Sequence, residues 1–231
     1  SDTVAEYEYD GAKRRTIQKS YDTGTLDETR HLYYTEPSKW QVIEERVDSD
    51  TDPDRQFVWG LRYIDDLILR GRDTTGNGQL DERLYALQDA NWNVTSVTDA
   101  TGAIQQRIAY SAYGNPTFLD ASLGAGSNST QYDYLFAGYR RDADSDLYAV
   151  RHRIYSAVLG QWCQPDPIPL LSERNLYEYC DSRPVSTTDS TGLVGMAIPL
   201  AGPTIAACLA VPPCAAALAI ATGLAIGGVA C

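Results

Sequence analysis

The chain has few basic side chains: 19 lysines and arginines stand against 31 aspartates and glutamates, which leaves a net charge of −12. Binding to a nucleic-acid backbone depends on a basic face that displaces counterions. The composition therefore excludes nucleic acid as the expected partner. A chain of 231 residues with 43% apolar side chains can still bury a core of ordinary size.

Metal-binding patterns are also missing. The two histidines lie far apart, at positions 31 and 152, and none of the five cysteines forms a C-x-x-C pair. We therefore expect no cofactor. Cys163 and Cys180 could form a disulfide, but buried free thiols are the favoured interpretation.

A weak calcium candidate is the loop "DTTGNGQLDE" at 73–82. Asp73, Asn77 and Asp81 take positions 1, 5 and 9 of an EF-hand loop. Position 12 is Leu84, where a bidentate Glu is wanted. A glycine-rich turn between hairpins is therefore favoured over a metal site.

Phenylalanine is scarce, at 3 residues against 16 tyrosines. This bias favours many half-buried side chains with one wet end over one deep apolar core. Tyrosine and β-branched residues alternate around Asp/Gly turns in three segments, at 7–22, 92–117 and 132–155. We expect an all-β array of hairpins over residues 1 to about 180, with strand edges covered by neighbouring repeats.

Charge is absent from Ser190 to Cys231. Prolines interrupt the apolar runs of 194–231, so each is shorter than the ~20 residues that span a bilayer comfortably. We expect a short apolar helical tail. It could contact a membrane as a broken helical hairpin or pack inside the fold. The tail holds no general acid or base, so any effector activity is expected beyond residue 231, in a chain truncated at both ends.

The hairpins resemble the YD-repeat, or RHS-repeat, proteins of bacteria, whose hairpins wind as a continuous strip into a hollow shell. The similarity is strongest in "LYAVRHRIYSAVLGQWCQPDPI" (147–168) and "NLYEYCDSRPVSTTDSTGL" (175–193). These follow the RHS-associated core pattern of L-Y-x-x-R-x-R-x-Y, G-x-[FW], D-P, N-L-Y-x-Y and D-x-x-G-L. Bacterial RHS toxins and the C components of insecticidal toxin complexes are of this kind. Ser190 stands where the usual closing motif, D-P-x-G-L, has proline.

The resemblance implies three parts: YD/RHS repeats over 1–118, a core domain that plugs the shell over 119–193, and a variable cargo segment from 194 to 231. It also implies self-cleavage after the leucine of the closing motif, at the bond between Leu193 and Val194. The cut segment would stay inside the shell as cargo.

An aspartyl mechanism needs two carboxylates, one to accept a proton from water and one to donate to the leaving amine. Asp166 and Asp189 are the candidates, and Gly192 would let the backbone pass close to them. Arg153 matches the arginine that the family places beside its aspartates, where it would favour ionisation or stabilise an oxyanion. The substrate is covalently attached, so one turnover suffices.

Simpler interpretations stay open. Asp-Pro and Asp-x-x-Gly are common turns, and Arg153 could be a plain strand-surface charge. The chain could also be a non-enzymatic cell-surface or wall-associated protein that binds carbohydrate or another cell, or a surface protein anchored in a membrane by its uncut tail. Under the self-cleavage hypothesis, the partners are the chain's own C-terminal segment, the rest of the shell and the secretion machinery. The expected location is secreted or on the bacterial cell surface.

Overall fold

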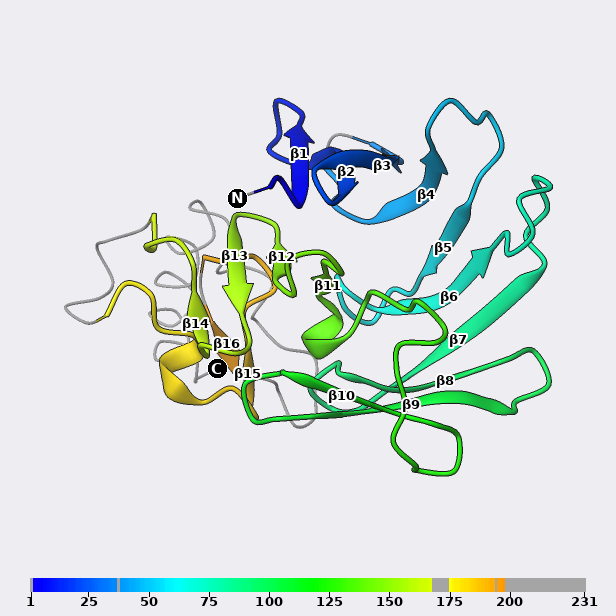
Figure 1. Cartoon of the computed structure of the whole chain (residues 1–231). Coiled ribbons are helices and arrows are strands. Elements are labelled where there is room, and N and C mark those ends of the chain that lie inside the picture. Colours follow the sequence, from blue (N-terminus) through cyan, green and yellow to red (C-terminus); the bar gives the residue numbers. More distant parts are fainter. Residues whose placement is uncertain (1, 37, 168–174, 194, 198–231) are drawn as a thin grey trace, which may run out of the picture.

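The computed structural model describes residues 2–36, 38–167, 175–193 and 195–197. Ten strands form one antiparallel sheet in which each strand pairs with the next in sequence (Figure 1). This sheet is termed the strip. Its strands are β1 (Ala5–Tyr9), β2 (Arg15–Asp22), β3 (Thr25–Tyr34), β4 (Val42–Val47), β5 (Arg55–Trp59), β6 (Leu67–Arg72), β7 (Glu82–Gln88), β8 (Val94–Thr98), β9 (Ile104–Tyr110) and β10 (Pro116–Leu119).

The strip curves around the part of the chain that follows it, here termed the inner segment (130–167 and 175–193; Figure 1). The inner segment contains a four-stranded antiparallel sheet, two short 3-10 turns and β15. β15 pairs with β16, which follows the inner segment in sequence. The elements are η1 (Phe136–Gly138), β11 (Arg140–Arg141), β12 (Tyr148–Val150), β13 (Arg153–Ser156), β14 (Gln161–Trp162), η3 (Cys180–Ser182), β15 (Thr187–Thr188) and β16 (Met196–Ala197).

Several turns of the strip share one local structure. An aspartate side-chain oxygen accepts hydrogen bonds from the amides two and four residues later, at 2.8–3.0 Å. The residue three positions after the aspartate has a positive φ, between 63° and 85°. The short side chain of aspartate is suited to this turn because its carboxylate accepts hydrogen bonds from turn amides that would otherwise lack a partner. The four aspartates are Asp10, Asp89, Asp99 and Asp120.

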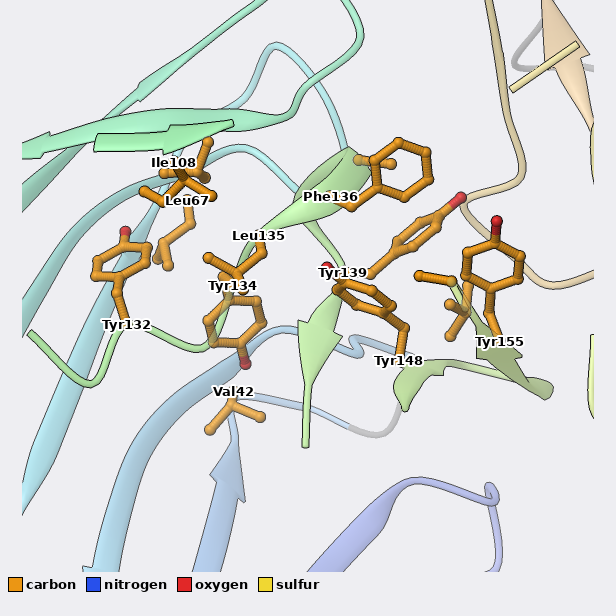
Figure 2. Close-up of a cluster of buried hydrophobic side chains, with 14 of the residues drawn as sticks. Val42, Leu67, Ile108, Tyr132, Tyr134, Leu135, Phe136, Tyr139, Tyr148 and Tyr155 are labelled. Carbon is orange, nitrogen blue, oxygen red and sulfur yellow. The ribbon is translucent and has the colours of Figure 1, made fainter. Parts of the chain in front are cut away.

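Tyrosines gather where the strip meets the inner segment (Figure 2). Tyr139, Tyr148 and Tyr155 are 2% exposed or less. The Tyr148 and Tyr155 hydroxyls donate to the carbonyl oxygens of Gly114 and Tyr113, at 2.9 and 2.8 Å. The expectation of half-buried tyrosines with one wet end is therefore wrong for this cluster. Protein carbonyls replace water as partners, so that burial leaves no unpaired hydroxyl on these two rings.

The all-β hairpin strip predicted from the sequence is confirmed. Of the tail, Met196 and Ala197 form a strand rather than a helix, and the remainder of the expected helical tail lies outside the described residues. Among the residues described, no helix has the length and apolar character needed to cross a membrane. Cys163 and Cys180 are free thiols, as favoured, but Cys163 is exposed rather than buried.

Candidate active site

Three charged side chains that are distant in sequence meet in the inner segment. Nη2 of Arg153 lies 3.1 Å from Oδ2 of Asp166 and 3.3 Å from Oδ2 of Asp189. The side chains of Arg153 and Asp189 are 4% and 2% exposed, whereas that of Asp166 is 21% exposed. The fold thus brings all three candidate catalytic residues together and leaves Asp166 the most accessible to water.

Arg153 is held on several sides. It extends from β13, and its guanidinium carbon lies 4.2 Å from the ring centroid of Trp162 on the adjacent strand β14. Its Nε donates to the carbonyl oxygen of Gly192, the residue before Leu193. A cation stacked on an indole and hydrogen-bonded through both Nε and Nη2 has little rotational freedom. The interpretation of Arg153 as a plain strand-surface charge is therefore wrong.

Asp189 forms the same turn that recurs in the strip, but in a buried place. Its Oδ1 accepts hydrogen bonds from the amides of Thr191, Gly192 and Leu193 at 3.2, 2.9 and 3.2 Å, and from the Thr191 hydroxyl at 3.0 Å. Gly192 has φ +70°, and a Cβ there would lie 2.7 Å from the carbonyl oxygen of Val150. Glycine is required here for both conformation and space. The backbone at Gly192 thus passes close to Val150, and its amide contacts one of the two acids, Asp189.

Two tyrosines lie on the other side of Asp189. Tyr179 is the last tyrosine of N-L-Y-x-Y in the core pattern, whereas Tyr139 precedes that pattern. The amide of Asp189 donates to the Tyr139 hydroxyl at 3.0 Å, and that hydroxyl lies 3.1 Å from the Tyr179 hydroxyl. Burial raises the pKa of both phenols well above the ordinary value, so both stay neutral. Because the contacting residues are 40 and 50 positions apart, no local pattern could reveal the pair.

Arg151 also contacts the closing motif. Its Nη1 donates to the carbonyl oxygen of Ser190, and its Nη2 lies 2.5 Å from Oδ1 of Asp65 on the strip. Arg151 belongs to the R-x-R part of the core pattern, so its position was visible in the sequence, but its partner was not. Val194 lies outside the described residues, whereas Leu193 is half-buried at the end of the Asp189 turn.

The site is separate from a cleft that lies between the strip and the inner segment. That cleft has a volume of about 90 Å³ and is lined by Trp40, Trp59 and Arg151 among others, whereas neither candidate aspartate lines it. A site that acts on a peptide of its own chain needs no entrance for a diffusing substrate.

The calcium candidate forms a closed turn instead. The two carboxylate oxygens of Asp73 accept from the amides of Thr75 and Gly76 and from that of Gly78, at 2.6–2.9 Å. Asp81 accepts from the amide of Thr74 at 2.9 Å. No group of three or more His, Cys, Asp or Glu side chains suited to a metal occurs among the described residues. The loop therefore has the hydrogen bonding of a turn.

The chain aligns with curated proteins over most of its length. The chain is 28% identical over 192 residues to a tRNA3(Ser)-specific nuclease WapA of Bacillus spizizenii and 26% identical over the same length to the tRNA nuclease WapA of Bacillus subtilis. Each alignment covers 81% of this chain but 7% of the relative. A 57-residue stretch is 42% identical to the uncharacterized Escherichia coli protein YibJ, covering 25% of this chain and 24% of YibJ. No family model matches the chain.

Solved structures share the fold. The TcdB2-TccC3 complex without its hypervariable C-terminal region matches 82% of this chain with a TM-score of 0.61 and 18% identity. A Tc holotoxin pore of Photorhabdus luminescens matches 87% with a TM-score of 0.61 and 19% identity. Each match covers 9% of the larger chain. The chain therefore has the β-strip fold of a short part of these toxin complexes and spans less than a tenth of the length of the WapA relatives.

Proposed function

We propose that the chain is the C-terminal portion of an RHS-repeat shell protein that encloses a C-terminal segment and cuts its own backbone after Leu193 to release it. The observation that carries this proposal is the convergence of Asp166, Asp189 and the Gly192 carbonyl on the guanidinium of Arg153. Arg153, which pairs with both acids, contacts the carbonyl one residue before Leu193. Carboxylates that can transfer protons, held next to an attached peptide, are the groups that hydrolysis of that peptide uses.

The proposal divides the chain into repeats over 1–118, a core over 119–193 and cargo from 194 onward. The strip ends at Leu119, close to the first boundary. The matched relatives are nucleases named for different tRNAs, and the related toxin complex has a C-terminal region named as hypervariable. These names support a common fold followed by a varying effector. The partners would be the remaining shell and the secretion machinery, outside the bacterial cell or on its surface.

The two carboxylates have different surroundings and would have different roles. Oδ1 of Asp189 is filled by donors from its own turn, so this residue orients the peptide. Asp166 is the more exposed and would accept the proton of a water molecule as its oxygen attacks the Leu193 carbonyl carbon. The same proton then passes to the nitrogen of Val194 as the C–N bond breaks. One water is consumed, and one carboxyl and one amino terminus result.

Arg153 would stabilise the charge that develops during this reaction. Its guanidinium pairs with both acids and already donates to the carbonyl one residue upstream of Leu193. A fixed cation next to a developing oxyanion lowers the barrier without reorganising in the transition state. Its stacking on Trp162 keeps it there.

The test is the intact mass of the full chain over time, beside Asp166→Asn and Asp189→Asn. Asparagine keeps the Oδ1 acceptor that the 189–193 turn uses but removes the charge. We expect the parent to yield a fragment ending at Leu193 and both variants to stay whole. The matched control is Asp99→Asn, which alters the same turn in a hairpin of the strip and should be cut like the parent.

One observation favours a non-enzymatic role: the turn of Asp189 also occurs in the strip, where it has no candidate catalytic role. The four aspartates of those turns are Asp10, Asp89, Asp99 and Asp120. Under this alternative, the inner segment is a structural plug of a surface protein that binds carbohydrate or another cell, with its tail uncut. A folded parent that keeps its full mass would decide for it.

A further inference from the structure

The ion pair between Arg151 and Asp65 joins the strip to the closing motif. Asp65 lies in the loop between β5 and β6, and Arg151 lies 86 residues later in the turn between β12 and β13. The pair is bidentate, with Nη2 at 2.5 Å from Oδ1 and Nη1 at 3.1 Å from Oδ2. Both side chains are nearly buried, at 8% and 11% exposure. Paired, parallel contacts of this kind fix both the position and the plane of a guanidinium.

Arg151 passes this placement on to the turn that holds Asp189. The Nη1 that contacts Asp65 also donates to the carbonyl oxygen of Ser190. The neighbouring residue, His152, donates its amide to the carbonyl oxygen of Thr191 at 3.3 Å. Two successive carbonyls of the closing motif are therefore held by the β12–β13 turn. The bond to be cut follows two residues after Thr191.

The backbone at Arg151 indicates that the side chain, not the turn itself, is what the position needs. Arg151 has φ +34°, a region that favours glycine. Holding a long side chain there costs free energy, and such costs are met where surrounding contacts fix the residue. The contacts with Asp65 and Ser190 are the ones that do so.

The strip side of the pair is equally constrained. A Cβ on Gly138 of the inner segment would lie 2.5 Å from the carbonyl oxygen of Asp65, so the two backbones are in close contact there. The ring of Tyr63, in the same loop, stacks on Trp92 with centroids 4.7 Å apart. The loop that carries Asp65 is thus wedged between the strip and the inner segment. The contact between Asp65 and Arg151 therefore spans the strip and the inner segment.

We propose that Asp65 and Arg151 are positioning residues that make self-cleavage depend on closure of the strip around the inner segment. This rests on the proposed function. Without the strip, Arg151 lacks its carboxylate and the Ser190 carbonyl lacks an oriented donor, so the acids and the peptide are misaligned. The cut is thereby delayed until the segment to be released is enclosed. A buried ion pair is suited to this role because it gives geometric specificity more than net stability.

The first experiment measures the first-order rate of cutting of the full chain for the parent, Asp65→Asn and Arg151→Ala. We expect both variants to be cut about 100-fold more slowly, the usual effect of a small misalignment at a reacting centre. The matched control is Asp142→Asn, which breaks another buried pair between the strip and the inner segment, that of Asp142 with Arg15 at 2.9 Å. This pair makes no contact with the closing motif, so the control should be cut at the parent rate.

A second measurement separates positioning from general loss of structure. Guanidinium ion at millimolar concentration should restore part of the rate to Arg151→Ala, because it can occupy the vacated place between Asp65 and Ser190. It should do nothing for Asp65→Asn. Amide hydrogen exchange at His152, Gly192 and Leu193 should become faster in Asp65→Asn and stay unchanged in Asp142→Asn.

The outcomes are distinguishable from those of the proposed function. Cutting of Asp65→Asn at the parent rate, or equal slowing in Asp142→Asn, would overturn the positioning role of Asp65 and Arg151 while self-cleavage stands. A parent that is never cut overturns self-cleavage and, with it, any control of it. In that case unchanged exchange at Gly192 and Leu193 in Asp65→Asn would also overturn the positioning of the turn.

Discussion

At the scale of single residues, the surroundings of an aspartate decide what it can do. Asp99 and Asp189 use the same oxygen to hold the amides two and four residues ahead. Asp99 is partly exposed, and its other oxygen accepts from the Gln105 amide. Asp189 is buried, and its other oxygen faces Arg153, which also holds Asp166. One turn thus supplies both a hairpin corner and a candidate active site.

The glycine of this turn offers a direct test. We expect Gly192→Ala to destabilise the protein and to abolish cutting, because the new Cβ would lie 2.7 Å from the Val150 carbonyl oxygen at φ +70°. The control is Gly102→Ala, which has φ +85° but open space around its Cβ position. Both variants lose the roughly 1–2 kcal/mol of a left-handed residue, and Gly192→Ala loses roughly 1–3 kcal/mol more through overpacking.

Urea unfolding and intact mass measure these two effects. Equal destabilisation of the two glycine variants would contradict the close approach at Gly192. Normal cutting of a folded Gly192→Ala protein would mean that the turn can shift without disturbing the acids.

At the scale of elements, the aromatic cluster contacts the candidate active site through the hydroxyl of Tyr139. The rings of Tyr139, Tyr155 and Tyr179 pack near Phe136, with ring centroids 6.2 Å from it. Figure 2 shows this cluster. Each of the three hydroxyls has a hydrogen-bond partner, and that of Tyr139 accepts a hydrogen bond from the Asp189 amide. The cluster is therefore both the packing core of the inner segment and the support for one catalytic candidate.

Removing single hydroxyls separates these two roles. We expect Tyr139→Phe and Tyr155→Phe to lose similar stability, about 1–3 kcal/mol, because each removes the partner of one backbone group: the buried amide of Asp189 or the part-buried carbonyl of Tyr113. Cutting should be slowed about tenfold in Tyr139→Phe, equivalent to ~1.4 kcal/mol, and remain normal in Tyr155→Phe. Thermal unfolding and the first-order rate measure the two quantities. Identical rates would show that the phenol at 139 serves packing alone.

The sequence was informative about elements whose signals are local. Alternating strands and Asp turns predicted the strip, and the ordered core pattern selected Arg153, Asp166 and Asp189, which the fold brings together. The contacts of Arg151 with Asp65 and of Asp189 with Tyr139 could not be predicted, because they depend on how the strip curves and how the inner segment seats. Burial of the tyrosines was missed for the same reason.

At the scale of the whole molecule, buried ion pairs join the strip to the inner segment. Glu45 on β4 is fully buried and lies 2.9 Å from Arg140 on β11 and 3.1 Å from Arg30 on β3. Arg55 on β5 lies 2.5 Å from Asp133. A polar interface of this kind fixes the register between two bodies more than it adds stability, since desolvation offsets much of the attraction. Some of the many acidic side chains therefore pair across this interface, a carboxylate of the strip with an arginine of the inner segment or the reverse.

Glu45 makes this interface sensitive to acid. Burial opposes its charge, but Arg140, Arg30 and Arg55 outweigh burial and lower the pKa of Glu45 from 4.5 to about 2. A carboxyl whose pKa is lower in the folded state stabilises the fold above its unfolded pKa, and this contribution is lost as the pH falls from 4.5 towards 2. The difference of the two pKa values corresponds to roughly 3 kcal/mol in total, of which roughly 2 kcal/mol is lost by pH 3.

The measurement is the free energy of unfolding in urea at pH 7 and pH 3 for the parent and Glu45→Gln. At pH 7 we expect the variant to be less stable by about 3–5 kcal/mol, because it leaves buried arginines without their carboxylate. At pH 3 the gap between the two proteins should narrow by roughly 2 kcal/mol, since the parent has then lost much of the same interaction. Other carboxyls titrate equally in both proteins and cancel in the difference. A gap that stays constant between the two pH values would contradict a lowered pKa of Glu45 in the folded protein.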